Sequence, residues 1–61
     1  MYKNIRDIRE DSDIRQNVIA ELLNVDRSVY SKYESGNLTF PIQTLIKLAD
    51  FYDTSVDYLL R

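Results

Sequence analysis

The sequence predicts an all-α domain built from five short helices, and three observations support that class. Apolar residues recur at intervals of three and four along each long segment, as they do on one face of a helix. No segment alternates apolar and polar residues in the manner of a half-buried strand. The single glycine and the single proline stand between these segments rather than inside them. At 61 residues the chain has room for one domain, over residues 1–61.

The first helix is expected over residues 2–10. Tyr2, Ile5 and Ile8 follow one another there at intervals of three, so they form one apolar stripe that can face a core. Residues 11–13 read Asp-Ser-Asp, and because these residue types favour turns and caps, they are expected to end the helix.

The second and third helices are expected to follow each other closely. The second covers about residues 15–23, and Asn24 is expected to end it because Asn tolerates the left-handed conformation common at helix C-termini. Its apolar residues have helical spacing: Ile14, Val18, Ile19, Leu22 and Leu23. Asp26 stands where an N-cap acceptor is wanted, and the third helix then runs to residue 34 or 35. Gly36, the only glycine, is expected to close it in the left-handed conformation.

The fourth helix is expected to begin at Pro41, whose fixed φ suits the first helical position, and to run to about Tyr52. The face expected to be buried comprises Ile42, Leu45, Ile46, Ala49 and either Phe51 or Tyr52. Residues 53–54 are expected to form a turn, after which Ser55 can cap a last helix over residues 56–60.

The stretch of about residues 16–35 carries the functional signal. Its two helices are joined by only three residues, 24–26, and so short a joint forces the helices to cross steeply. Such a crossing needs a small residue at the closest approach, and Ala20 fits that place. The second of the two helices has an inner side of Val25, Val29, Tyr30 and Tyr33. Its outer side is polar, with two cations and no acid: Arg27, Ser28, Ser31, Lys32 and Ser35. The pattern predicts a helix-turn-helix, whose second helix enters the major groove of DNA.

With these features in order, the chain resembles the Cro/cI repressor class of bacterial and phage regulators, often called the xenobiotic-response-element type. The residues that carry the resemblance are Gln16, Ala20, Asn24, Val25, Arg27, Ser28, Lys32, Glu34 and Gly36, then Pro41, residues 44–49 and residues 55–60. It covers roughly residues 5 to 60. It implies a compact five-helix domain of the lambda-repressor-like DNA-binding type, with the helix-turn-helix in the second and third helices.

The resemblance also implies roles for single residues. Arg27, Ser28 and Lys32 lie at the positions that face base edges, and Arg or Lys can bond guanine O6 and N7 there. Ser31 is a candidate for contact with a base, a phosphate or water. Gln16, at the start of the second helix, is expected to contact a phosphate and to buttress the third helix, and free N–H groups at a helix N-terminus attract anions. Further candidates for phosphate contacts are Arg15, Tyr33, Ser35 and Asn37.

Two inner residues of the third helix, and an acid at its end, need polar partners. The hydroxyls of Tyr30 and Tyr33 are expected to reach water, a partner or a phosphate. Glu34, an acid near the expected DNA-facing side, is expected to pair with Arg27 or Arg9 or to cap a neighbouring element.

A single domain of this size makes few phosphate contacts, so a homodimer on an inverted-repeat operator is expected, with half-sites ~34 Å apart. Tyr58 is the main candidate for the dimer interface, with Tyr52 and Leu59 beside it. A chain with no visible activating or ligand-sensing domain is expected to act as a repressor of transcription.

Composition limits the alternatives. The chain has eight Lys and Arg against ten Asp and Glu, a net charge of −2, so non-specific DNA binding is expected to be weak. Without Cys or His, disulfides are excluded, and no metal, cofactor or small-molecule ligand is expected. No catalytic constellation is visible, which argues against an enzyme. Apolar runs are too short for a signal peptide or a membrane span, so a soluble cytoplasmic protein is expected. The alternative is a protein-binding helix-turn-helix module such as an antitoxin or adaptor.

Overall fold

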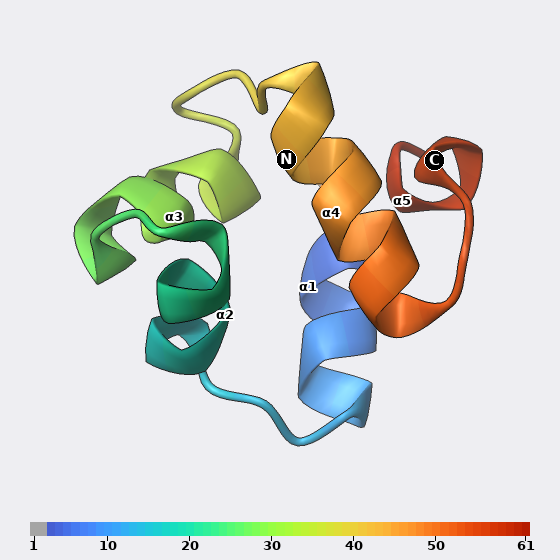
Figure 1. Cartoon of the computed structure of the whole chain (residues 1–61), viewed down its shortest axis with the longest axis horizontal. Helices are drawn as coiled ribbons and strands as arrows, with labels where there is room; N and C mark the ends of the chain where they lie inside the picture. The colour runs from blue at the N-terminus through green and yellow to red at the C-terminus, as the bar shows by residue number, and fades with distance from the viewer. Residues whose placement is uncertain (1–2) are drawn as a thin grey trace.

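Residues 3–61, the part of the chain that the computed structural model describes, fold into five α-helices (Figure 1). The helices are α1 (Lys3–Asp11), α2 (Gln16–Leu23), α3 (Arg27–Ser35), α4 (Ile42–Tyr52) and α5 (Val56–Leu59). No strand occurs within residues 3–61, so the predicted all-α class is confirmed. None of these helices is long and apolar enough to cross a membrane.

The helices form two groups around α1. Figure 1 shows α2 and α3 on one side of the molecule and α5 on the other, with α4 in front of α1 between them. The packed pairs are α2 with α3, α4 with α5, and α1 with both α3 and α5. Because α1 touches members of both groups, it fixes the position of α3 relative to the C-terminal part of the chain.

The observed helix bounds differ from the predicted ones by about a residue. Helix α1 runs one residue further than predicted, to Asp11, and the predicted contribution of Tyr2 lies outside the described residues. Helix α2 begins at Gln16, with Arg15 as an N-cap residue that makes no side-chain cap. Helix α5 ends at Leu59, one residue before the predicted end.

Three of the predicted caps are confirmed. Asn24 ends α2 in the left-handed conformation, with φ 60° and ψ 44°. Gly36 ends α3 with φ 90°. The hydroxyl of Ser55 accepts a hydrogen bond of 3.0 Å from the backbone N–H of Tyr58. Each cap satisfies backbone groups that a short helix would otherwise leave unpaired.

Two predictions about helix starts need correction. Asp26 occupies the N-cap position of α3, but its side chain accepts no cap hydrogen bond, so its carboxylate stays exposed to solvent. Pro41 is the N-cap residue of α4 rather than its first helical residue, because its ψ of 144° is extended and the helix begins at Ile42. Its φ of −62° still directs the chain into the helix.

The core draws on all five helices and on one loop residue. Its buried residues are Ile5, Ile19, Ala20, Leu23, Tyr30, Phe40, Leu45, Leu48, Ala49 and Leu59. The edge of the Tyr30 ring packs against Phe40, with ring centroids 6.5 Å apart, and Tyr33 stacks on the same ring at 4.9 Å. The loop between α3 and α4 is thereby fixed to the inner side of α3.

The buried face of α4 is rotated from the predicted one. Leu45 and Ala49 are buried and Tyr52 is half-buried, as predicted. Ile42 and Ile46, however, are 61% and 49% exposed, so their predicted burial is wrong. Leu48, absent from the predicted face, is fully buried. Residues 45, 48, 49 and 52 form one stripe at intervals of three and four, and the two isoleucines lie beyond its edge.

Candidate nucleic-acid interface

Helices α2 and α3 pack against each other, and a small residue of α2 is buried. Ala20 is buried, and its carbonyl accepts a hydrogen bond of 2.9 Å from the backbone N–H of Val25, just past the end of α2. A larger side chain at Ala20 would force the two helices apart. The helix-turn-helix predicted for about residues 16–35 is therefore present, with α3 as its second helix.

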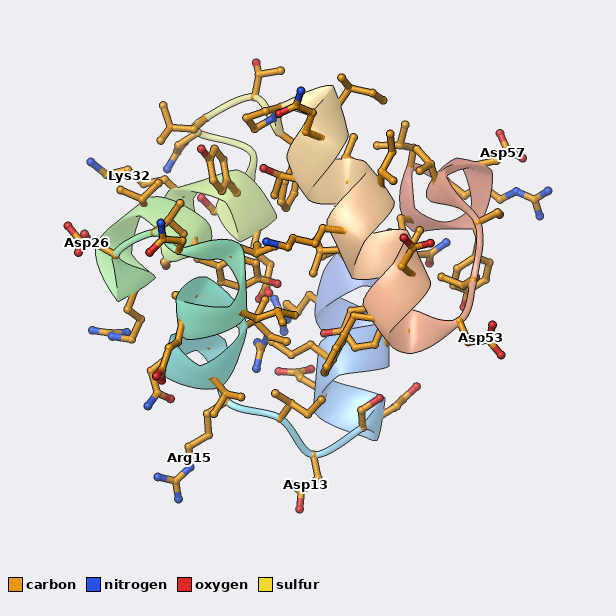
Figure 2. All side chains as sticks on the ribbon, viewed as in Figure 1. Asp13, Arg15, Asp26, Lys32, Asp53 and Asp57 are labelled. Carbon is orange, nitrogen blue, oxygen red and sulfur yellow. The ribbon has the colours of Figure 1, made fainter. Side chains whose placement is uncertain are left out.

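The outer face of α3 is open to solvent. Arg27, Ser28 and Lys32 are exposed, and Ser31 is half-buried on the flank of the same face. Ser28 and Lys32 are four residues apart and therefore lie one above the other. Figure 2 shows Lys32 extending away from the body of the molecule. Two cations with hydroxyl groups between them can offer hydrogen-bond donors and acceptors to the base edges of a groove.

The candidates for phosphate contact lie at two places. Arg15 and Gln16 stand at the start of α2, where Arg15 is exposed and extends from the molecule in Figure 2, while Gln16 is half-buried. Ser35 and Asn37 are exposed at the end of α3, and the hydroxyl of Ser35 donates to the carbonyl of Lys32 at 3.1 Å. Tyr33 is half-buried and its ring is held against Phe40, so only part of it can reach a ligand.

The side of the molecule formed by α2 and α3 carries exposed side chains of both charges. In Figure 2, Arg15 and Lys32 extend from the side formed by α2 and α3, and Asp53 and Asp57 from the side of α5. Asp26 also projects beside α3, and Glu21 is exposed on α2. Only the outer side of α3 itself, with Arg27 and Lys32, has exposed cations without an exposed acid, so the net charge of −2 is not spread evenly over this side.

Behind this face lies a buried polar cluster centred on Glu34. Arg9 of α1 donates from Nε and Nη2 to the two carboxylate oxygens, at 2.9 Å each, and from Nη1 to the carbonyl of Ile14 at 2.9 Å. Gln16 donates from Nε2 to Glu34 Oε1 at 3.2 Å. The partner of Glu34 is thus Arg9, one of the two cations that the sequence suggested. The hydrogen bond to Gln16 links the start of α2 to α3, as the expected support of the third helix by Gln16 requires, but Glu34 was not predicted as its partner.

The charge state of Glu34 follows from its partners. Burial alone would raise the pKa of its carboxyl, but hydrogen bonds from Arg9 and Gln16 and the positive charge of Arg9 outweigh burial, and the pKa lies below its ordinary value. Glu34 is therefore ionised at neutral pH. Its charge is balanced within the cluster by Arg9, so it adds little repulsion toward a phosphate.

Two tyrosine hydroxyls near this cluster are buried without a hydrogen-bond partner, those of Tyr30 and Tyr52. Burial, and then the negative charge of Glu34, raises the pKa of Tyr30, although no hydrogen bond of acceptable geometry joins the two groups. Burial raises the pKa of Tyr52 to about 12. The expectation that the hydroxyl of Tyr30 reaches water or a phosphate is wrong, because the whole residue is buried in the core; the charged group that acts on this hydroxyl is Glu34.

The three candidates for a dimer interface differ in exposure. Tyr58 is 42% exposed on α5, and Tyr52 is half-buried with its hydroxyl inside. Leu59 is fully buried in the core, so it has no surface to offer a second subunit. The reason is the direction of α5, whose short helix turns Leu59 inward and Tyr58 outward.

A protein family described as helix-turn-helix matches residues 5–59 of the chain. The chain is similar to the uncharacterized HTH-type transcriptional regulator YqaE of Bacillus subtilis (strain 168), with 32% identity over 59 residues, covering 97% of this chain and 51% of YqaE. It is 34% identical over 56 residues to the cryptic phage CTXphi transcriptional repressor RstR of Vibrio cholerae, covering 92% of this chain and 50% of RstR. It is also 34% identical over 58 residues to the HTH-type transcriptional regulator ImmR of Bacillus subtilis (strain 168), covering 95% of this chain and 46% of ImmR. The chain thus spans about half the length of these relatives. No solved structure matches it significantly.

Proposed function

The chain belongs to the helix-turn-helix family, of the Cro/cI type, and from that membership we propose that it binds duplex DNA sequence-specifically and regulates transcription. The observation that carries the proposal is the outer face of α3, where Arg27, Ser28 and Lys32 are exposed together. An acid-free polar face on the second helix of a helix-turn-helix suits insertion into the major groove.

In this proposal α3 reads the bases and its surroundings hold the backbone. Arg27 can bond O6 and N7 of a guanine with two donors, and Lys32 can donate to the same atoms as a single charge. Ser28 and Ser31 add hydroxyl contacts to base edges or to water between them. The start of α2, with Arg15 and Gln16, faces one phosphate, and the end of α3, with Ser35 and Asn37, faces another.

The regulatory outcome proposed is repression. One of the similar proteins, RstR, is named a transcriptional repressor. A DNA-binding domain that occupies a promoter excludes the transcription machinery without needing any further contact. Binding as a dimer on an inverted repeat is part of the proposal, because two copies double the number of base contacts and place the second α3 one helical turn away.

For the dimer we propose an interface on the α4–α5 side, built around Tyr58 with the edge of Tyr52. Large apolar residues are exposed on these helices, including Ile42, Ile46 and Phe51 of α4 and Leu60 just after α5. Sedimentation of the wild-type protein and of Tyr58→Ala tests this. The proposal expects a dimer that Tyr58→Ala weakens, and a monomer that also fails to pair on DNA would contradict it.

The alternative of a protein-binding module such as an antitoxin or adaptor is less well supported. A protein-binding face on α3 would be expected to expose large apolar side chains. The large apolar side chains exposed within residues 3–61 are Val18, Leu38, Ile42, Ile46, Phe51, Tyr58 and Leu60, and none is on α3.

Selection from random duplex DNA tests the proposed function. The wild-type protein is incubated with a random duplex library at two salt concentrations, and bound DNA is amplified and sequenced. The proposal predicts enrichment of a short inverted repeat, with weaker retention at the higher salt concentration. A library that remains random after repeated rounds would contradict sequence-specific binding and favour the protein-binding alternative.

A further inference from the structure

One carboxylate oxygen of Glu34 is shared by two donors from different helices. Oε1 accepts from Arg9 Nη2 at 2.9 Å and from Gln16 Nε2 at 3.2 Å. Glu34 is only 4% exposed, whereas Gln16 is half-buried at the edge of the surface. The amide of Gln16 therefore lies between a buried anion and the solvent.

The chemistry of this contact fixes the orientation of the Gln16 amide. An ionised carboxylate can only accept hydrogen bonds, so it selects the NH₂ end of the amide and rejects the carbonyl end. Nε2 carries two hydrogens, and Glu34 takes one of them. The oxygens of a DNA phosphate likewise only accept hydrogen bonds. The second hydrogen of Gln16 Nε2 is therefore free to be donated to a phosphate.

The surroundings connect this amide to the DNA-facing surface. One recess of about 350 Å³ between α1, α2 and α3 is lined by Gln16, Glu34, Ser31 and Ser35, and on the side of α1 by Arg9 and the ion pair of Arg6 with Glu10. Ser31 and Ser35 also belong to the outer side of α3. The buried cluster thus opens onto the surface proposed to meet DNA, and the positive charge of Arg9 keeps the cluster neutral there.

We infer that Glu34 is a positioning residue for DNA binding, which acts through Gln16 by holding its NH₂ group toward a backbone phosphate; the inference rests on the proposed function. Arg9 supports the same arrangement by fixing the carboxylate of Glu34 and, through Nη1, the carbonyl of Ile14 just before α2. The phosphate contact thus depends on a group that does not touch DNA.

A double-mutant cycle on a duplex selected by the wild-type protein tests this inference. The first variant is Gln16→Ala. The second is Arg9→Met with Glu34→Leu, which replaces a buried ion pair by apolar residues of similar volume and is expected to keep the fold. The third combines all three substitutions. Urea unfolding confirms that each variant is folded before its affinity is measured.

If Glu34 acts through Gln16, Gln16→Ala weakens binding about tenfold, as expected for loss of a hydrogen bond to a charged group. The ion-pair variant weakens binding by a similar factor, and the combined variant is no weaker than either, because both remove the same contact. The inference would be overturned if the loss of affinity in the combined variant were the product of the two separate losses. An ion-pair variant that binds DNA like the wild type would overturn it as well. A wild-type protein that selects no duplex would overturn the proposed function and this inference with it.

The side-chain amide signals of Gln16 in an NMR spectrum give a second readout, which needs no DNA. A hydrogen bond to Glu34 shifts one of the two Nε2 protons away from the solvent-exposed range, and the ion-pair variant returns it to that range. Two solvent-like protons in the free wild-type protein would overturn the inference, whatever the DNA measurements show.

Discussion

The guanidinium of Arg9 and the carboxylate of Glu34 form a bidentate ion pair that joins α1 to α3. Nε and Nη2 of Arg9 each lie 2.9 Å from a carboxylate oxygen, and the side chains of Arg9 and Glu34 are 11% and 4% exposed. The residues are 25 apart in the chain, so the pair fixes α3 against α1. The pair therefore links the helix that carries the recognition surface to the N-terminal helix.

Breaking the ion pair from one side is expected to be costly. Glu34→Gln removes the negative charge and leaves Arg9 buried without a counter-charge, which should lower the free energy of unfolding by ~3–5 kcal/mol. Replacing both partners, Arg9→Met with Glu34→Leu, should restore most of the loss. Urea denaturation of the three proteins measures this. Equal stability of the single variant and the wild type would show that the pair is not closed in solution.

The ion pair also makes stability depend on pH. Because the pKa of Glu34 is lower in the folded protein than its ordinary value of 4.5, its contribution is fully present above pH 4.5 and is lost as pH falls through the folded pKa. Unfolding free energies of the wild type and of Arg9→Met with Glu34→Leu are compared from neutral pH to about pH 3. As pH falls, the unfolding free energy of the wild type should decrease more than that of the variant. Equal decreases in the two proteins would contradict the contribution assigned to Glu34.

Because the buried face of α4 includes Leu48 and not Ile46, truncating these two residues is expected to affect stability unequally. Leu48→Ala empties a fully buried site and should lower the free energy of unfolding by ~2–5 kcal/mol. Ile46→Ala, on the same helix, should change it by ~0.5 kcal/mol or less in the monomer, because its side chain is already half exposed. Urea denaturation at low protein concentration separates the two. A larger loss for Ile46→Ala would mean that the originally predicted face is the buried one.

The exposed carboxylate of Asp26 is expected to oppose DNA binding. Asp26→Asn removes one negative charge beside α3 and should tighten binding to a random-sequence duplex severalfold at low salt, with a smaller gain at high salt because salt screens exposed charges. Asp53→Asn, on the opposite side of the molecule, is the matched control and should change nothing. Fluorescence anisotropy measures both. Weaker binding by Asp26→Asn would indicate that the carboxylate itself contacts a base.

Much of the fold could be predicted from the sequence, because the residues that end the helices act through their own local backbone preferences. Asn24 and Gly36 end their helices through their own backbone preferences, so the positions of α2 and α3 could be predicted to within a residue or so. The outer polar side of α3 followed from spacing alone. The buried face of α4 did not, because Ile42, Leu45, Ile46 and Leu48 are all apolar and only packing against neighbouring helices decides among them.

The buried cluster was only partly predictable, for a different reason. Glu34 stood out as an acid near the polar outer side of the third helix, and Arg9 was one of two cations proposed as its partner. The third member, Gln16, depends on how α2 crosses α3, which no local pattern specifies. The burial of Leu59 likewise depends on the direction of a four-residue helix.

The central claim is that Arg27 and Lys32 of α3 read DNA bases. Its most direct test is the affinity of Arg27→Ala and Lys32→Ala for the duplex that the wild-type protein selects. Lys47→Ala is the control, because it makes the same charge change at an exposed position of α4. Each α3 variant should bind about tenfold or more weakly, as expected for a base contact of ~1–3 kcal/mol, and should lose preference at one position of each half-site. Lys47→Ala should bind like the wild type. Unchanged affinity and unchanged sequence preference in both α3 variants would contradict the account.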